Sequence, residues 1–150
     1  MPEHLEIRAA YVRWLRRAAP LLLVPLVLTG LVQAASSAEW WSAGPPPSGS
    51  VRYMFIAVAV AGLVVGRNVR DRDTARDVRP VGVAKIASLS WELVLYALAP
   101  VIIGAVLVFM TRQLWDFYAL LFATLVGIGV LFPRFDQWVA WAAPSPAGDA

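Results

Sequence analysis

Four apolar stretches, each long enough to form a helix across a lipid bilayer, dominate this chain of 150 residues. A helix needs about 20 apolar residues to cross roughly 30 Å of hydrocarbon. The stretches cover residues 18–38, 51–69, 83–110 and 114–132. None alternates in steps of two, and an open sheet leaves unpaired edges in lipid, so each is predicted to be a helix. The sequence therefore predicts an all-α, polytopic integral membrane protein with four transmembrane helices in a single bundled domain.

Composition supports the same class, because 59% of the residues are hydrophobic and 15% are charged, against about 25% charged in soluble domains. After the fourth stretch, the chain reaches Pro133 and continues with aromatic side chains spaced three residues apart. For residues 133–150 we expect a short interfacial helix followed by a loose C-terminal tail.

The cationic side chains predict the orientation of the chain. Eleven would lie on one side of the membrane: Arg8, Arg13, Arg16, Arg17, Arg67, Arg70, Arg72, Arg76, Arg79, Lys85 and Arg134. Only Arg52 and Arg112 would lie on the other side. Because positive residues accumulate on the cytoplasmic side, both termini are expected there, in a multi-pass protein of a bacterial cytoplasmic (inner) membrane.

Seven tryptophans are expected to anchor the helices at the two membrane surfaces. The inner group is Trp14, Trp91, Trp138 and Trp141, and the outer group is Trp40, Trp41 and Trp115. An alternative concerns the N-terminus, where basic residues, an apolar core and small residues up to Ala38 also resemble a secretory signal. Residues 1–38 are therefore either a retained span or a cleaved signal.

The chain lacks the residues that several kinds of metal binding and catalysis require. The chain has no cysteine and one histidine, His4, which precedes the first apolar stretch. Cysteine-ligated metal sites, thiol chemistry and a haem held by two histidines of one chain are excluded, and no catalytic constellation is found. We therefore expect neither an enzyme nor a metal site. The 13 basic residues against 10 acidic ones predict no nucleic-acid partner, because the arginines lie beside apolar spans.

A polar stripe in the third span is the main candidate site. Steps of three and four residues place Lys85, Ser88, Glu92 and Tyr96 on one helix face. An ionisable side chain inside a span is costly and often functional. Counting back from Met110, however, about 30 Å of helix ends near Trp91. Glu92 is therefore either an interfacial or subunit-pairing carboxylate, or a proton or cation site.

Small residues and prolines suggest further features of the spans. Ala57, Ala61, Gly62 and Gly66 in the second span predict close helix–helix packing, either within the chain or with another chain. Pro25 and Pro100 lie inside the first and third spans, where each is expected to kink its helix.

Small four-helix membrane families do not account for this pattern. Small multidrug pumps carry a carboxylate deep in the first span, which has none here, and the asparagine-rich signatures of fluoride channels are absent, since Asn68 is the only asparagine. The Arg79-Pro80 to Glu92 spacing is too short for the carboxylate of an ATP synthase rotor subunit. With ATP synthase assembly protein I the chain shares its size and a lysine, Lys85, that opens the third span. No family is identified.

Two functions remain as expectations. The first is a non-catalytic accessory or assembly subunit of a larger bacterial membrane protein complex, with membrane lipid and other membrane subunits as partners. The alternative is a small homo-oligomeric proton-coupled transporter or channel that uses Glu92. No cofactor is predicted, although contact with lipid, pigment or quinone stays open because apolar and aromatic walls are nonspecific.

Overall fold

A computed structural model describes residues 4–38, 41, 49–73 and 81–143, and every element in these ranges is a helix. The elements in chain order are α1 (His4–Ala18), η1 (Ala19–Leu23), α2 (Val24–Ser36), α3 (Gly49–Asp73), α4 (Val83–Thr111), α5 (Leu114–Leu131) and α6 (Phe135–Ala142). Four helical segments are long and apolar enough to cross a membrane, the first being α1, η1 and α2 together. The all-helical class predicted from the sequence is confirmed, and so is the prediction of four helices long and apolar enough to span a membrane.

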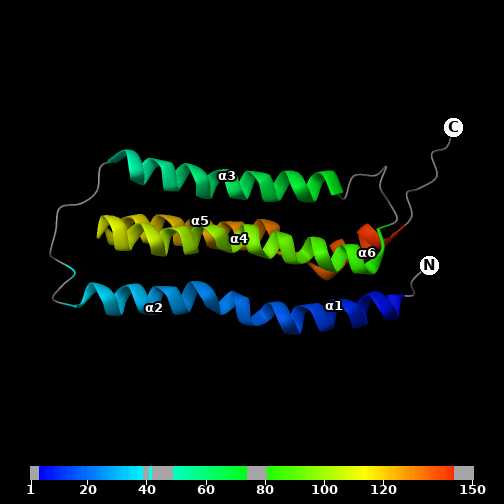
Figure 1. Cartoon of the computed structure of the whole chain (residues 1–150). Coiled ribbons are helices and arrows are strands. Elements are labelled where there is room, and N and C mark those ends of the chain that lie inside the picture. The colour runs from blue at the N-terminus through cyan, green and yellow to red at the C-terminus, as the bar shows by residue number, and fades with distance from the viewer. Residues whose placement is uncertain (1–3, 39–40, 42–48, 74–80, 144–150) are drawn as a thin grey trace.

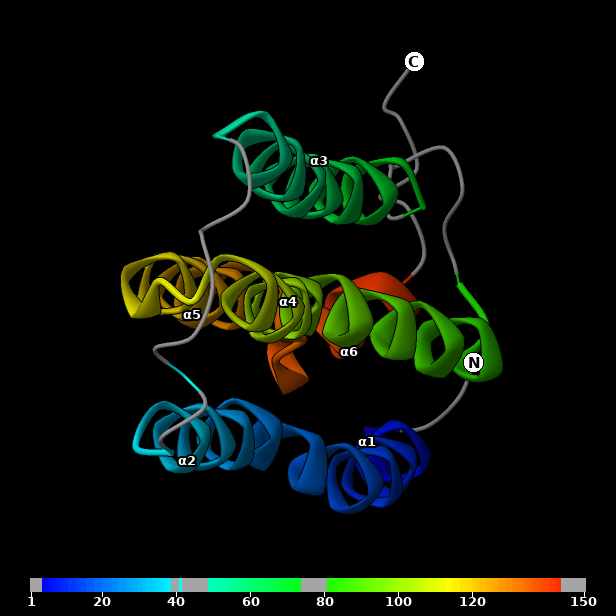
Figure 2. The ribbon, with the colours of Figure 1, turned by 60° about the vertical axis from the view of Figure 1, so that its left-hand side comes forward.

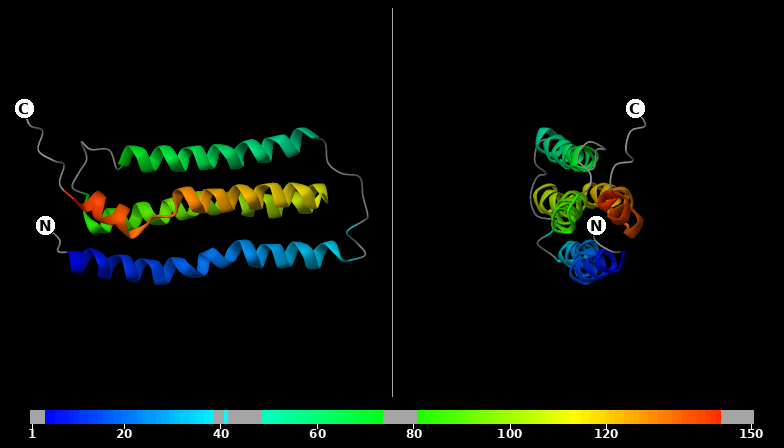
Figure 3. Two further views of the ribbon diagram at one scale, coloured as in Figure 1. Left: turned by 180° about the vertical axis from the view of Figure 1, so that it is seen from behind. Right: turned by 90° about the vertical axis from the view of Figure 1, so that its right-hand side faces the viewer.

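The helices form three layers (Figure 1). The antiparallel pair α4 and α5 forms the middle layer, with α3 on one side and the α1–α2 segment on the other, as a second view confirms (Figure 2). The described chain begins and ends at the same end of the bundle, where α6 lies beside the first turns of α4 (Figure 3). An even number of crossings requires this arrangement of the termini.

A tight turn joins α4 to α5. Arg112 adopts a left-handed conformation with φ of 55°, and its N–H donates to the Val108 carbonyl over 2.7 Å. Its side chain donates to the Trp41 carbonyl at 2.9 Å, which holds the residue in a conformation that disfavours side chains other than glycine. Within the pair, a Cβ added at Gly104 would lie 3.0 Å from Leu120 Cβ, so the two backbones are closely packed.

The first span differs from the prediction of a helix over residues 18–38. Helix begins at His4, and residues Ala19–Leu23 form a tighter 3₁₀ segment between α1 and α2. The reason lies in Pro20 and Pro25, because neither proline has the N–H that an α-helix would require at its position. The 3₁₀ segment instead uses shorter-range bonds, such as that from the Val24 N–H to the Leu21 carbonyl. The predicted distortion at Pro25 therefore lies in the turn before this residue.

The second helix is longer than the apolar stretch that predicted it. The apolar run ends near Val69, but α3 continues to Asp73. Arg67 and Asp71 are one turn apart with 3.7 Å between their charged atoms, and Arg70 donates to the Val130 carbonyl of α5 at 2.7 Å. These contacts stabilise the polar last turns of α3.

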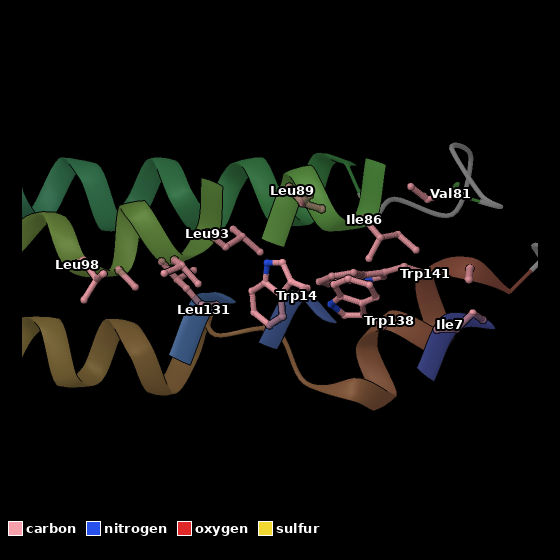
Figure 4. Close-up of a cluster of buried hydrophobic side chains, with 14 residues drawn as sticks. Ile7, Trp14, Val81, Ile86, Leu89, Leu93, Leu98, Leu131, Trp138 and Trp141 are labelled. Atoms are coloured by element: carbon pink, nitrogen blue, oxygen red, sulfur yellow. The ribbon is translucent and has the colours of Figure 1, made fainter. Parts of the chain in front are cut away.

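A core of buried side chains joins α1, α4 and α6 (Figure 4), at the end of the bundle where the described chain begins and ends. Trp14 and Trp138 have their ring centroids 5.7 Å apart, and Trp14 and Trp91 meet edge to face at 6.2 Å. The α6 helix starts where the Gln137 side chain accepts the Arg134 N–H at 3.0 Å, and it is tied back by the Val81 N–H, which donates to the Trp141 carbonyl.

This core corrects the expectation that the inner tryptophans are anchors facing the lipid surface. Trp14, Trp138 and Trp141 are buried, and Trp91 is half-buried. Beyond Pro133 the chain continues beside α1 and α4, so the apolar face of α6 packs against protein. Among the outer tryptophans, Trp115 is 76% exposed and remains suited to an anchoring role, and Trp41 is half-buried. Trp40 lies outside the described residues.

Candidate functional site

The polar stripe of α4 lies on one helix face and points away from the interior. Lys85, Ser88 and Glu92 are exposed, and none has a hydrogen bond or ion pair with the described residues. Tyr96, the fourth member, is half-buried and packs against α3, since a Cβ added at Gly66 would lie 2.8 Å from Tyr96 Cβ. The chain by itself therefore brings no charged or polar partner to Glu92.

The same exposed face of α4 becomes apolar beyond Glu92. Leu95, Ile102, Val106 and Phe109 are exposed along it, so the face changes once from polar to apolar. From Glu92 to Thr111 the helix rises about 28 Å at 1.5 Å per residue. If Thr111 lies at one edge of a hydrocarbon layer of about 30 Å, Glu92 lies at the other edge, where a charge costs little.

The small residues of α3 serve two different surfaces. Gly66 packs inside the bundle, where an added Cβ would meet Tyr96 at 2.8 Å and Leu131 at 3.1 Å. At Gly62 an added Cβ would meet nothing within 4 Å. Ala57 and Ala61, one turn apart, are exposed. Of the four predicted small residues, Gly66 therefore packs within the chain, and Ala57, Ala61 and Gly62 leave open space on the outward side.

The helix α4 runs without interruption through Pro100, which is buried. The sequence predicted a kink here, because proline has no N–H for the Tyr96 carbonyl. Pro100 borders no described cavity. Its side chain contributes to the interior packing of the bundle.

An ion pair that the sequence analysis missed joins three helices at the end of the bundle opposite the termini. Arg52 in the first turn of α3 approaches Asp116 in the first turn of α5, with 2.5 Å between Nη2 and Oδ1. The Thr111 hydroxyl at the end of α4 donates to Asp116 Oδ2 at 3.3 Å. Asp116 is 1% exposed and Arg52 is 34% exposed. The sequence held a signal for this pair: Asp116 and Arg52 each lie in the first turn of an apolar span, and the two first turns are expected at the same end of the bundle.

Asp116 is the one buried carboxylate among the described residues, and both of its oxygens have partners. An aspartate in the first turn also interacts favourably with the partial positive charge of the helix N-terminus. These two contacts hold the first turn of α3 against the α4–α5 turn. A second polar contact, between Gln33 of α2 and the Tyr118 hydroxyl of α5, joins the opposite layer to the same pair.

The described residues offer few groups that could bind a metal or a polar ligand. No group of three or more His, Asp or Glu side chains gathers there as a metal site would require. Four buried polar atoms in this part of the chain lack a hydrogen-bond partner: Trp14 Nε1, Ser90 Oγ, Thr124 Oγ1 and Trp138 Nε1. Trp14 also lines an open groove beside two arginines, Arg13 and Arg17.

No protein-family model matches this chain, and no similar protein is found among curated proteins or solved structures. The features described above define its class: an all-helical protein with four helices that are long and apolar enough to cross a membrane.

Proposed function

We propose that this chain is a non-catalytic accessory or assembly subunit of a larger complex in a bacterial inner membrane, with both termini in the cytoplasm. The observation that carries the proposal is the outward face of α3. Only 11% of the most apolar window of this helix is buried, compared with 50% in α4. On that outward side lie the exposed Ala57 and Ala61 and the open position at Gly62.

The chemistry of this face favours another transmembrane helix as its partner. In lipid, helices associate through close packing, and small side chains let two backbones approach closely. The α3 helix is already held on its other side, where Gly66 meets Tyr96 and Leu131 and where Arg52 meets Asp116. A rigidly held helix with a free small-residue face presents a preformed surface, which lowers the ordering cost of association.

The absence of cysteine from the chain makes a direct test possible. Ala61→Cys and Ala57→Cys place a single thiol on the proposed contact face, and Ala119→Cys places one on the exposed face of α5 as the matched control. After thiol crosslinking in native membranes, we expect Ala61→Cys and Ala57→Cys to join the tagged chain to one larger membrane protein, identified by mass spectrometry. Crosslinking equal to that of Ala119→Cys, or only to a second copy of the chain, contradicts the proposal.

A second candidate function is a homo-oligomeric proton-coupled transporter or channel, favoured by the exposed and unpartnered Glu92. In such an assembly, Glu92 and Lys85 of one copy would face another copy across the exposed face of α4. The test is proton flux into proteoliposomes. Glu92→Gln should abolish the flux, and Glu6→Gln, which changes an exposed carboxylate on α1, should leave it unchanged. Equal flux in Glu92→Gln and the unmodified chain eliminates this candidate.

A further inference from the structure

A groove of about 320 Å³ runs between α1 and the first turns of α4, at the end of the bundle where the described chain begins and ends. It is lined on one side by Arg13, Trp14 and Arg17 and on the other by Ala87 and Trp91. A second hollow of about 350 Å³ adjoins it and shares its Ala10, Arg13 and Val83 lining. Each volume is in the range typical of small-ligand sites.

The donors in this groove are not matched by acceptors. Arg13 and Arg17 are exposed, lie one helical turn apart, and have no ion pair or hydrogen bond with the described residues. Trp14 is 4% exposed and its indole nitrogen is enclosed by protein atoms, so the two guanidinium groups are the donors that a ligand in the groove can reach. The only carboxylate on the lining is Glu6, in the second hollow.

The surroundings of the groove are amphipathic along the bundle axis. One turn further along each element come Leu21, half-buried on η1 after Arg17, and Leu95, exposed on α4 after Trp91. The α4 wall of the groove leaves room for a ligand because Ala84 and Ala87 have small side chains. A ligand that fits has a negatively charged head beside Arg13 and Arg17 and a hydrocarbon portion beside the leucines.

We propose that this groove binds an anionic glycerophospholipid of the cytoplasmic leaflet. The two arginines hold the phosphate of the headgroup, and an acyl chain passes Trp91 toward Leu95. Basic pockets between helices on the cytoplasmic side suit such headgroups, because two guanidinium groups outside the hydrocarbon attract an anion and donate several hydrogen bonds. This inference rests on the membrane placement proposed above.

The experiment measures the lipid that remains bound to the intact chain. The tagged chain is purified from nanodiscs that contain phosphatidylcholine and phosphatidylglycerol in equal amounts, and lipid adducts are counted by native mass spectrometry. We expect one retained phosphatidylglycerol per chain and no comparable retention of phosphatidylcholine. Arg13→Gln with Arg17→Gln should weaken phosphatidylglycerol binding about thirtyfold, the loss expected from removing two cations at a lipid surface.

Two further variants separate the groove from general charge attraction. Arg8→Gln with Arg16→Gln removes the same charge from exposed positions of α1 that do not line the groove, and should change binding less than threefold. Ala87→Trp fills the groove without a change in charge and should reduce retention as strongly as the double arginine variant. If the Arg8 and Arg16 variant loses as much lipid as the Arg13 and Arg17 variant, or if Ala87→Trp retains its lipid, the site is wrong.

The source of the phosphate is tested by competition. Soluble glycerophosphoglycerol or inorganic phosphate at millimolar concentration should not displace the lipid, because neither has an acyl chain. Full displacement by either compound overturns the lipid in favour of a free anion. The membrane placement is checked separately: a chain that does not fractionate with membranes refutes the proposed function, whereas a membrane-inserted chain without lipid preference refutes only this site.

Discussion

Asp116 shows how one buried charge links the separate layers at the residue scale. Its Oδ1 pairs with the Arg52 guanidinium, and its Oδ2 accepts a hydrogen bond from the Thr111 hydroxyl. A single side chain at the start of α5 therefore contacts both α3 and the end of α4. Removing one partner of a buried pair leaves the other charge without compensation. Here the penalty is moderated because Arg52 is 34% exposed and regains water.

We expect Asp116→Asn to lower the free energy of unfolding by about 2 kcal/mol. The measurement is unfolding of the purified chain in mixed micelles on titration with a denaturing detergent. The control is Asp71→Asn, whose carboxylate is 54% exposed and pairs with Arg67 at the surface, with an expected change below about 1 kcal/mol. Equal losses of unfolding free energy in the two variants would show that the Arg52–Asp116 pair contributes no more to stability than a surface ion pair.

Two glycines of α3, Gly62 and Gly66, allow a comparison of packing within one helix. Gly66→Ala places a methyl group 2.8 Å from Tyr96 Cβ, so α3 must shift away from α4, at a cost of about 1–3 kcal/mol. Gly62→Ala meets nothing within 4 Å and raises helix propensity, so it should be neutral or stabilising by up to about 1 kcal/mol. The same detergent titration measures both, and destabilisation by Gly62→Ala in the isolated chain contradicts this packing.

At the scale of elements, the sequence predicted where the helices are better than where they end. The limits of α4 and α5 each agree within a residue of the predicted spans at 83–110 and 114–132, because Arg112, Gln113 and Pro133 interrupt the apolar runs. The α3 helix extends beyond the predicted span at 51–69, because ion pairs such as Arg67–Asp71 stabilise a helical turn that is not apolar. The α1 helix was not predicted, because its stability comes from tertiary contacts of Trp14 with α4 and α6.

The short helix α6 is expected to hold α1 in place. Trp138 is fully buried and meets Tyr11 and Trp14 of α1 at centroid distances of 5.4 and 5.7 Å. Trp138→Ala should therefore lower the free energy of unfolding by about 3–5 kcal/mol. It should also release α1, so that trypsin cleaves after Arg16 or Arg17. Trp115→Ala, at a 76% exposed position, should change stability by less than about 0.5 kcal/mol. Trypsin resistance equal to that of the unmodified chain would show that α1 is held without α6.

At the scale of the whole molecule, the faces of the helices could not be predicted from the sequence. The spans are apolar on every side, so periodicity does not separate a face that packs on protein from one that meets lipid. The spacing of Lys85, Ser88 and Glu92 predicts one helix face, but only the positions of the neighbouring helices show that these three residues are exposed. The Arg52–Asp116 pair was missed because its members are far apart in the chain.

The membrane topology is the prediction on which the proposed function depends. The described chain begins and ends at one end of the bundle, and most of the cationic residues gather at that end. Reporter domains fused to Met1 and Ala150 should therefore both be active in the cytoplasm, and a thiol at Ser50→Cys should react with an impermeant reagent added outside cells. A periplasmic reporter at either terminus would reject this topology.

The central position of the α4–α5 pair has a consequence for biogenesis. Both outer layers pack on this pair from opposite sides, yet α1–α2 and α3 precede it in the chain (Figure 2). If the chain inserts into the membrane as proposed above, these earlier helices are synthesised before the pair on which they pack. We then expect the bundle to assemble only after the α4–α5 hairpin has been made, when the hairpin packs between helices already in the lipid.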